Sequence, residues 1–280
     1  MKSRSTEHDS VTGKTLHLRI WEPEETAGSD TPALVVVHGL GEHAGRYEHV
    51  ARHFVDHGFR VYGLDHGGFG RSGGRKGDTT VHVAVRDVVA LARRIDDECG
   101  ADARRVLLGH SLGGLLALVA LRDHPGRFHE AVVTGPALNA TRGINKALVG
   151  VSKILGRTLK HITLSNGLDP NGLSTDPEVV RAYNEDPLVH DRISAQLYLS
   201  MIEEGHRLRH APDSFPQDTR LLLMHGREDP ICYADDTEAY YASLPLSGKA
   251  LKVWPGMRHE ILNEVDRAEV LDEIDRFLSL

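Results

Sequence analysis

Cysteine and long hydrophobic runs are both scarce in this sequence. Its 280 residues include only Cys99 and Cys232, too few and too far apart for a disulfide framework or a cysteine-rich metal site, so we expect free thiols or packing residues. No apolar run approaches the roughly 18 residues that span a bilayer. The N-terminal stretch MKSRSTEHDS is polar and lacks the apolar core of a secretory signal. We therefore expect a soluble, cytoplasmic protein.

An excess of positive charge is also missing. The formal net charge is −7 at pH 7 with the 18 histidines neutral, which argues against nucleic acid as a partner. The hydrophobic content of 40% is ample for a full core in a soluble chain. At this length the sequence predicts one large domain, with room for an inserted subdomain.

The order of the apolar runs predicts an α/β fold. Most of these runs are unbroken, as in strands buried on both faces of a parallel sheet, whereas 15–21 alternates as in an antiparallel strand with one wet face. The unbroken runs lie at 33–37, 59–64, 105–108, 131–134, 220–224 and 250–254. Helical patterns lie between them, at about 46–57, 80–98, 112–124, 235–244 and 263–280. The alternation favours a doubly wound, mostly parallel central sheet flanked by helices.

One long segment interrupts this alternation. About 85 residues without a convincing strand separate the runs at 131–134 and 220–224, which is too long for a loop in a compact domain. Apolar residues recur at helical spacing over 144–159, and further helices are expected near 177–183 and 192–209. We therefore predict an inserted helical cap over 137–217, with the core formed by 1–136 and 218–280.

A serine between glycines follows the strand predicted at 105–108. Gly109, Ser111 and Gly113 match the pattern G-x-S-x-G, with a strand before it and a helical run after it. In that setting the serine occupies a strained strand-to-helix turn and acts as a nucleophile. The helix N-terminus behind it directs N–H groups and partial positive charge at the reacting centre. We interpret Ser111 as the nucleophile.

A serine hydroxyl needs a base to take its proton, and in this type of fold the chain order is serine, acid, histidine. The acid should follow a late strand, where Glu228 and Asp229 both stand. Asp229 is favoured because Pro230 stiffens the loop behind it, and Glu228 remains the alternative. Beyond Asp229 the chain has one histidine, His259. The predicted triad is Ser111, His259 as general base and Asp229 as the group that orients the imidazole.

Two backbone N–H groups are candidates for the oxyanion hole. One belongs to Leu112, directly after the nucleophile. The other belongs to Leu40 in the turn His38-Gly39-Leu40-Gly41, which follows an early strand. Both would stabilise the negative charge of a tetrahedral intermediate.

Several motifs in order along the chain resemble the monoacylglycerol lipases, members of the α/β-hydrolases close to the lysophospholipases. They are HGLGEHAGRYEHVARHF (38–54), LDHGGFGRSGG (64–74), LLGHSLGG (107–114), YNEDPL (183–188), HGREDP (225–230) and PGMRHEILNE (255–264). Many esterases share G-x-S-x-G, whereas HGxGEH-x-GRY with a late YNxDPL is much narrower. Two departures stand out: the family commonly has Asp-His-Arg-Gly-His-Gly where this chain has residues 65–70, and a methionine where Leu112 follows the serine.

The resemblance implies an α/β-hydrolase fold and a cofactor-free serine hydrolase that releases fatty acid and glycerol from monoacylglycerols through an acyl-enzyme. It supports the triad and both oxyanion donors. It further implies that Arg46 and Tyr183 lie near the polar pocket for the glycerol end, and that Glu42 anchors the oxyanion loop. A lysophospholipase or a general short- or medium-chain esterase is the alternative, and an acyltransferase on the same scaffold is a further one. A non-catalytic binding protein of the same fold is disfavoured by the intact triad candidates.

Two surface features complete the prediction. The apolar stripe at 144–159 could line the acyl pocket and touch a membrane or micelle surface, which would make the protein peripheral at a membrane; it could equally pack the cap on the core. His49, His53 and His57 follow one another at a spacing that zinc can use. No third ligand is evident in that stretch, so we favour a solvated helix face and expect no metal.

Overall fold

The fold is described from a computed structural model, which covers residues 1–24, 31–128, 130–142, 150, 154 and 157–280. Within these residues eight strands form one sheet in the order β1-β2-β4-β3-β5-β6-β9-β10. The strands are β1 (Lys2–Asp9), β2 (Thr15–Glu22), β3 (Ala33–Val37), β4 (Arg60–Leu64), β5 (Arg105–His110), β6 (Glu130–Thr134), β9 (Arg220–Gly226) and β10 (Lys249–Trp254). From β4 to β10 all neighbours are parallel, and β1 and β2 extend the sheet as an antiparallel hairpin.

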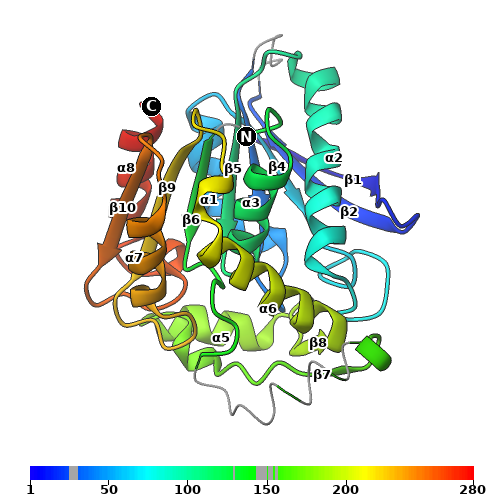
Figure 1. Cartoon of the computed structure of the whole chain (residues 1–280). Coiled ribbons are helices and arrows are strands. Elements are labelled where there is room, and N and C mark those ends of the chain that lie inside the picture. The colour runs from blue at the N-terminus through cyan, green and yellow to red at the C-terminus, as the bar shows by residue number, and fades with distance from the viewer. Residues whose placement is uncertain (25–30, 129, 143–149, 151–153, 155–156) are drawn as a thin grey trace.

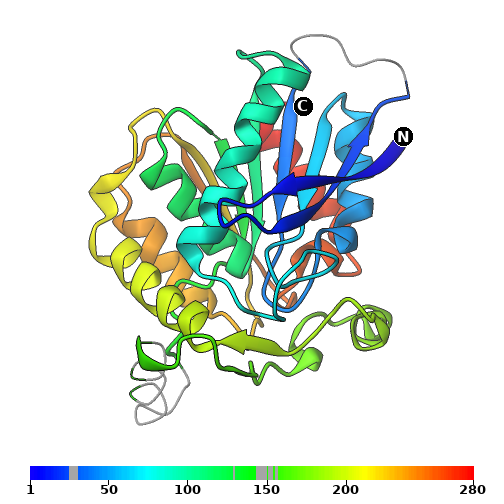
Figure 2. The ribbon, with the colours of Figure 1, turned by 90° about the vertical axis from the view of Figure 1, so that its right-hand side faces the viewer.

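Helices cover both faces of this sheet, as Figure 2 shows in side view. One face packs against α1 and α8, and the other against α2, α3, α6 and α7. Their bounds are α1 (Glu48–Asp56), α2 (Val81–Cys99), α3 (Leu112–Asp123), α5 (Pro177–Glu185), α6 (Ala195–His210), α7 (Ala234–Ser243) and α8 (Arg267–Leu278). Short 3-10 helices lie at η1 (Ala44–Tyr47), η2 (Pro170–Gly172), η3 (Pro212–Ser214) and η4 (Ile261–Asn263). Every residue of β3, β4 and β6 is buried, which explains why their sequences are unbroken apolar runs.

The segment between β6 and β9 is termed the β6–β9 connection, and its residues 163–194 lie below the carboxyl edge of the sheet, at the bottom of Figure 1. There α5 begins at Pro177, with the Asp176 side chain accepting the N–H of Glu178, a standard helix start. The last helix of the connection, α6, packs on α2 and α3 of the core. The helix predicted over 144–159 falls mostly on residues outside the described part of the chain.

The sequence prediction was wrong in two places. The connection contains a small antiparallel sheet of β7 (Thr163–Ser165) and β8 (Arg192–Ser194), although no strand was expected there. Each strand has only three residues, which is too short to show an alternating pattern. The edge strand β1 was also missed, because its sequence KSRSTEHD has no apolar side chain and it is mostly exposed.

The chain order of β3, β4 and β5 positions the site. From β3 the chain crosses through α1 to β4 on one side of β3, and from β4 it crosses through α2 to β5 on the other side. The carboxyl ends of β3 and β5 therefore flank a crevice of the kind where α/β sheets place their reacting groups. In the described residues no helix is both long and apolar enough to cross a membrane.

Candidate active site

Ser111 lies in the turn between β5 and α3 with φ 55° and ψ −116°. Among the described residues, it and Ser279 are the only non-glycine residues with positive φ. The flanking glycines allow this turn: a Cβ on Gly113 would lie 1.8 Å from the carbonyl oxygen of Val37, and one on Gly109 would lie 2.4 Å from the oxygen of Gly113. The G-x-S-x-G motif therefore lets the start of α3 touch β3 while the backbone holds the serine in a strained conformation.

The acid and the histidine of the site meet beyond the ends of β9 and β10. Asp229 Oδ2 accepts a hydrogen bond from His259 Nδ1 at 2.6 Å, and both side chains are buried. Glu228 is exposed. The structure thus brings Asp229, and not its neighbour, to the only histidine that follows it in the chain.

Asp229 is surrounded by donors. Its Oδ1 accepts the backbone N–H groups of Ile231 at 2.7 Å and Cys232 at 2.9 Å, and its Oδ2 accepts His225 Nε2 at 2.9 Å in addition to His259. Burial alone would raise the pKa of this carboxyl, but the neighbouring His259 and these hydrogen bonds hold it well below its usual range. Asp229 is therefore ionised at neutral pH.

His259 packs against His110, the residue directly before Ser111. The rings of His110 and His259 are 4.6 Å apart. Burial lowers the pKa of His259, but the charge and hydrogen bond of Asp229 outweigh burial and raise it above its ordinary value. Burial, followed by the nearby His259, lowers the pKa of His110 to about 4, so this neighbour is uncharged at neutral pH. Within the described chain no hydrogen bond joins Ser111 Oγ to His259, and such bonds commonly tighten only when substrate binds.

The sequence analysis gave no role to two residues that lie beside the predicted triad. His225 is fully buried, and because its Nε2 also faces the carbonyl of Cys232 at 2.7 Å, that nitrogen carries the proton and donates to Asp229. The Cys232 side chain lies in hydrogen-bonding reach of Ser111, and burial raises the pKa of its thiol well above the ordinary value. The only sequence signal for Cys232 was its position three residues after Asp229, and that spacing alone does not indicate a function.

The oxyanion loop follows β3. The N–H of Gly39 donates to Glu42 Oε1 at 2.6 Å, and Tyr47 Oη donates to the same oxygen at 2.7 Å. The N–H of Gly39 is therefore used to hold the loop and is not available to an oxyanion. Within the described residues the N–H groups of Leu40 and Leu112 have no hydrogen-bond acceptor, so both remain available to a developing oxyanion.

The Arg46 side chain lies in a buried network of ion pairs and is largely shielded from solvent. Its guanidinium donates to Glu42 Oε2 at 2.7 Å and to both oxygens of Glu260 at 2.6 and 2.8 Å. Burial would raise the pKa of both carboxyls, but the charge of Arg46 holds each below its usual range. This geometry favours a positioning role through Glu42 and the oxyanion loop, and contact between Arg46 and a glycerol group stays a prediction.

Tyr183, on α5, joins the β6–β9 connection to the oxyanion loop. Its ring lies 4.8 Å from the Arg46 guanidinium, and a Cβ on Gly41 would lie 3.2 Å from its hydroxyl oxygen. A hollow of about 180 Å³ opens beside Tyr183, and neither Ser111 nor His259 lines it. The residues around this hollow are Asn166, Leu168, Pro170, Leu173, Tyr183, Asn184, Asp186, Val189, His190 and Asp191.

The unusual loop at residues 65–70 is well packed. Phe69 is buried and stacks on His190 of the connection with ring centroids 5.0 Å apart. His190 Nε2 also donates to the carbonyl of Gly68 at 2.9 Å. Burial would raise the pKa of Asp65, but hydrogen bonds from His17 and two backbone N–H groups lower it to about 2. An aromatic contact between Phe69 and His190 thus joins this loop to the connection.

The chain order serine, aspartate, histidine, with each residue at the carboxyl end of a parallel strand, is that of the α/β-hydrolases, and this protein is a serine hydrolase of that class. A family model described as "Serine aminopeptidase, S33" matches residues 28–266. The chain is 34% identical to a monoacylglycerol lipase of Mycolicibacterium smegmatis over 99% of its own length and 98% of the relative. It is 30% identical to human monoglyceride lipase over 95% and 88% of the two chains.

Solved structures agree with the sequence relatives. The crystal structure of the monoacylglycerol lipase from Paleococcus ferrophilus superimposes with a TM-score of 0.86 at 31% identity, covering 94% of this chain and 98% of that one. The chain therefore belongs to the monoacylglycerol lipase family of the α/β-hydrolases.

Proposed function

We propose that this protein is a serine carboxylester hydrolase that converts monoacylglycerols to fatty acid and glycerol, with Ser111, Asp229 and His259 as its catalytic triad. The buried 2.6 Å contact between Asp229 Oδ2 and His259 Nδ1 carries the proposal, because it leaves His259 Nε2 free to take the proton of a neighbouring serine. The substrate class rests on the relatives from Mycolicibacterium and Paleococcus, which are named monoacylglycerol lipases.

The proposed reaction has two balanced halves. Ser111 Oγ attacks the ester carbonyl carbon while His259 Nε2 takes the hydroxyl proton. When the tetrahedral intermediate collapses, the ester C–O bond breaks and His259 returns the proton to the departing glycerol oxygen, which leaves an acyl group on Ser111. Water then repeats the sequence, releases the fatty acid and restores the serine.

The N–H groups of Leu40 and Leu112 are proposed to bind the oxyanion in both halves. They belong to different strand ends, so their relative position depends on the loop after β3. The Glu42 carboxylate, itself held by Arg46, ties that loop at Gly39. We expect donors fixed in this way to stabilise the transition state without reorganisation.

Residues 137–217 are proposed to form a cap over the acyl chain, with Arg46 and Tyr183 near the glycerol end. Contacts between the connection and the core loops support this placement. The N–H of His190 donates to the carbonyl of Gly41 at 2.9 Å, and His43 Nε2 lies 2.9 Å from an oxygen of Asp186. The connection is thus joined directly to the loop that carries one oxyanion donor.

The same segment is proposed to touch the lipid surface from which substrate is drawn. Within the described residues of the connection, four large apolar side chains are exposed: Ile154, Leu159, Ile162 and Leu164. Exposed apolar side chains gathered over about ten residues are typical of surfaces that meet a membrane or another molecule. This contact would keep the protein peripheral and would bring the cap to monoacylglycerol in a micelle or bilayer.

A turnover panel tests the substrate class. We would measure kcat/KM for monoacylglycerols of several chain lengths beside di- and triacylglycerols, lysophosphatidylcholine and p-nitrophenyl esters, with the Ser111→Ala variant as the blank. Monoacylglycerols are expected to be the best substrates. Glyceryl monoesters turned over no better than simple esters would refute the proposal in favour of a general esterase, and a preference for lysophosphatidylcholine would indicate a lysophospholipase. Transesterification that exceeds hydrolysis on addition of glycerol would indicate an acyltransferase.

A further inference from the structure

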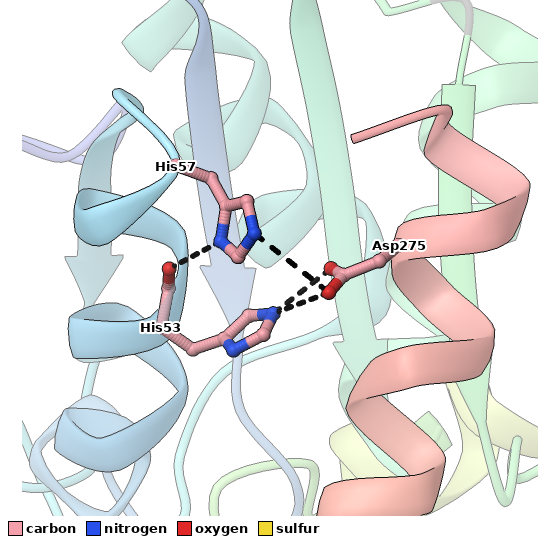
Figure 3. Close-up of side chains that lie close together, drawn as sticks. All are labelled: His53, His57 and Asp275. Carbon is pink, nitrogen blue, oxygen red and sulfur yellow. Dashed lines mark hydrogen bonds and ion pairs between the residues drawn. The ribbon is translucent and has the colours of Figure 1, made fainter.

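A cluster of two histidines and one aspartate joins two helices away from the triad (Figure 3). His53 and His57 lie one turn apart near the C-terminus of α1, and Asp275 faces them from the last turns of α8. Because α1 runs from the carboxyl end of β3 to the start of β4, this end of the helix lies toward the amino edge of the sheet. The triad lies at the opposite edge.

The three side chains present their ligand atoms to one another. His53 Nε2 is 2.8 and 3.0 Å from the two carboxylate oxygens of Asp275, and His57 Nε2 is 3.9 Å from Oδ2. All three ligand atoms lie within 4.8 Å of one another. A tetrahedral zinc site with bonds of about 2.0–2.1 Å needs ligand atoms roughly 3.3 Å apart. Small side-chain rotations therefore bring this cluster to metal-binding spacing. The metal takes the place of the hydrogen that His53 Nε2 donates to Asp275, and that proton is released to solvent or moves to Nδ1 of the same ring.

Hydrogen bonding orients His57 as a ligand. Its Nδ1 lies 2.9 Å from the carbonyl oxygen of His53, and since a carbonyl only accepts, Nδ1 carries the hydrogen. The other ring nitrogen, Nε2, faces Asp275 Oδ2 at 3.9 Å, which is too long for a hydrogen bond, so Nε2 is the nitrogen available to a metal. Metal-binding histidines typically donate their second ring N–H to a carbonyl in this way. The geometry favours a cation between His57 and Asp275.

The cluster is distinct from its surroundings on the same helix. His49, one turn earlier, directs Nε2 to the carbonyl oxygen of Leu262 at 2.8 Å and does not join it. The side chains of His53, His57 and Asp275 are 21%, 36% and 18% exposed. Solvent can therefore reach the cluster and supply both the ion and a water molecule for a fourth position.

We propose that His53, His57 and Asp275 form a binding site for a divalent transition metal, with Zn²⁺ as the best fit, which links α8 to α1. Two imidazoles and one carboxylate form a donor set that suits zinc, whereas magnesium and calcium prefer oxygen ligands alone. A metal held there binds the folded state and not the separated helices, so it stabilises the fold.

Zinc titration of the full chain tests the proposal. After EDTA treatment and dialysis, calorimetry with ZnCl₂ is expected to give one site per chain, and the melting temperature is expected to rise with the zinc concentration. Asp275→Asn and His57→Gln should each weaken the binding at least tenfold, in line with the loss of one of three ligands. Calorimetry is done well below the melting temperature and far-UV circular dichroism checks each variant, so a destabilised but folded variant still reports its affinity.

A second histidine pair supplies the matched control. His206 and His210 on α6 have the same spacing, stack at 3.9 Å and share the Nδ1-to-carbonyl bond, but the described residues add no carboxylate to complete a ligand group there. His210→Gln is expected to leave zinc affinity unchanged. The proposal is overturned if the wild type shows no saturable binding up to millimolar zinc, if Asp275→Asn keeps the wild-type affinity, or if His210→Gln removes the binding.

Discussion

Asp229 Oδ2 lies 2.9 Å from His225 Nε2, and the same oxygen accepts the hydrogen bond from His259. Two imidazoles thus converge on one oxygen, and backbone N–H groups hold the other. Four hydrogen bonds therefore hold the carboxylate in its orientation toward His259. The geometry of the proposed triad depends on these hydrogen bonds as well as on the three residues themselves.

Replacing Asp229 should therefore abolish most of the activity. Asp229→Asn is expected to lower kcat by about 10³- to 10⁴-fold, because the imidazole loses the group that sets its tautomer and stabilises its charge. Steady-state hydrolysis of a soluble ester measures this. Glu228→Gln is the matched control, since this neighbour is exposed, and it should keep wild-type kcat. Equal losses in the two variants would contradict the assignment of the acid.

The pH dependence of kcat/KM should reflect His259. The imidazole must be neutral to accept the Ser111 proton, so activity falls as the pH drops through its pKa. Burial lowers that pKa and Asp229 raises it more, so the acidic limb should have its midpoint above the ordinary histidine value of about 6.5. In the Asp229→Asn variant the acidic limb of the kcat/KM profile, measured on the residual activity, should shift to lower pH. A shift to higher pH would show that Asp229 does not set this pKa.

The strained turn should cost stability. Ser111→Gly relieves the positive φ, whereas Ser111→Ala keeps a Cβ there, so the glycine variant should unfold with a free energy about 1 kcal/mol higher than the alanine variant. Urea denaturation measures both. At Ser200, inside α6, the order should reverse because glycine weakens a regular helix. A less stable Ser111→Gly variant would argue against strain at the nucleophile.

Arg46 should matter for stability as well as for the position of the loop after β3. Arg46→Ala leaves the buried carboxylates of Glu42 and Glu260 without their cation, which is expected to lower the free energy of unfolding by about 3–5 kcal/mol. Arg181→Ala, on exposed α5, should leave it unchanged. A normal stability combined with a raised KM only for glyceryl esters would instead support the predicted contact between Arg46 and the glycerol end.

The exposed apolar side chains of the connection should matter only at an interface. Leu159→Glu with Leu164→Glu is expected to lower activity on micellar monoacylglycerol several-fold, because charged side chains resist insertion among lipids. Hydrolysis of a soluble p-nitrophenyl ester should stay unchanged. Val11→Glu, an exposed apolar position in the β1–β2 turn, serves as the control and should affect neither assay. A loss on both substrates would indicate a structural role.

The sequence predicted the core of the fold because the parallel strands are buried on both faces and therefore appear as unbroken apolar runs. The strand expected at 33–37 matches β3 to the residue. Strand β1 could not be predicted from its sequence, because it is an exposed edge strand paired only with β2. Its stability comes from backbone hydrogen bonds, which leave no trace in side-chain polarity.

The site was partly predictable for a similar reason. The G-x-S-x-G motif singled out Ser111, chain order singled out His259, and Pro230 favoured Asp229, because these signals are local or ordered along the chain. The pairing of Arg46 with Glu260 joins residues 214 positions apart, and no local pattern reports such a contact. Asp275, which lies with His53 and His57 in the cluster between α1 and α8, was not predicted for the same reason.

The β6–β9 connection begins and ends on strands that are neighbours in the sheet. Its two ends are therefore held at a fixed spacing by backbone hydrogen bonds that do not depend on what lies between them. Ser111 precedes the connection, while Asp229 and His259 follow it. On our proposal that this segment caps the acyl chain, insertions, deletions or whole replacements within it are expected to change which ester is admitted, while the strands that carry Ser111, Asp229 and His259 keep their positions. In this architecture substrate range could then evolve separately from chemistry.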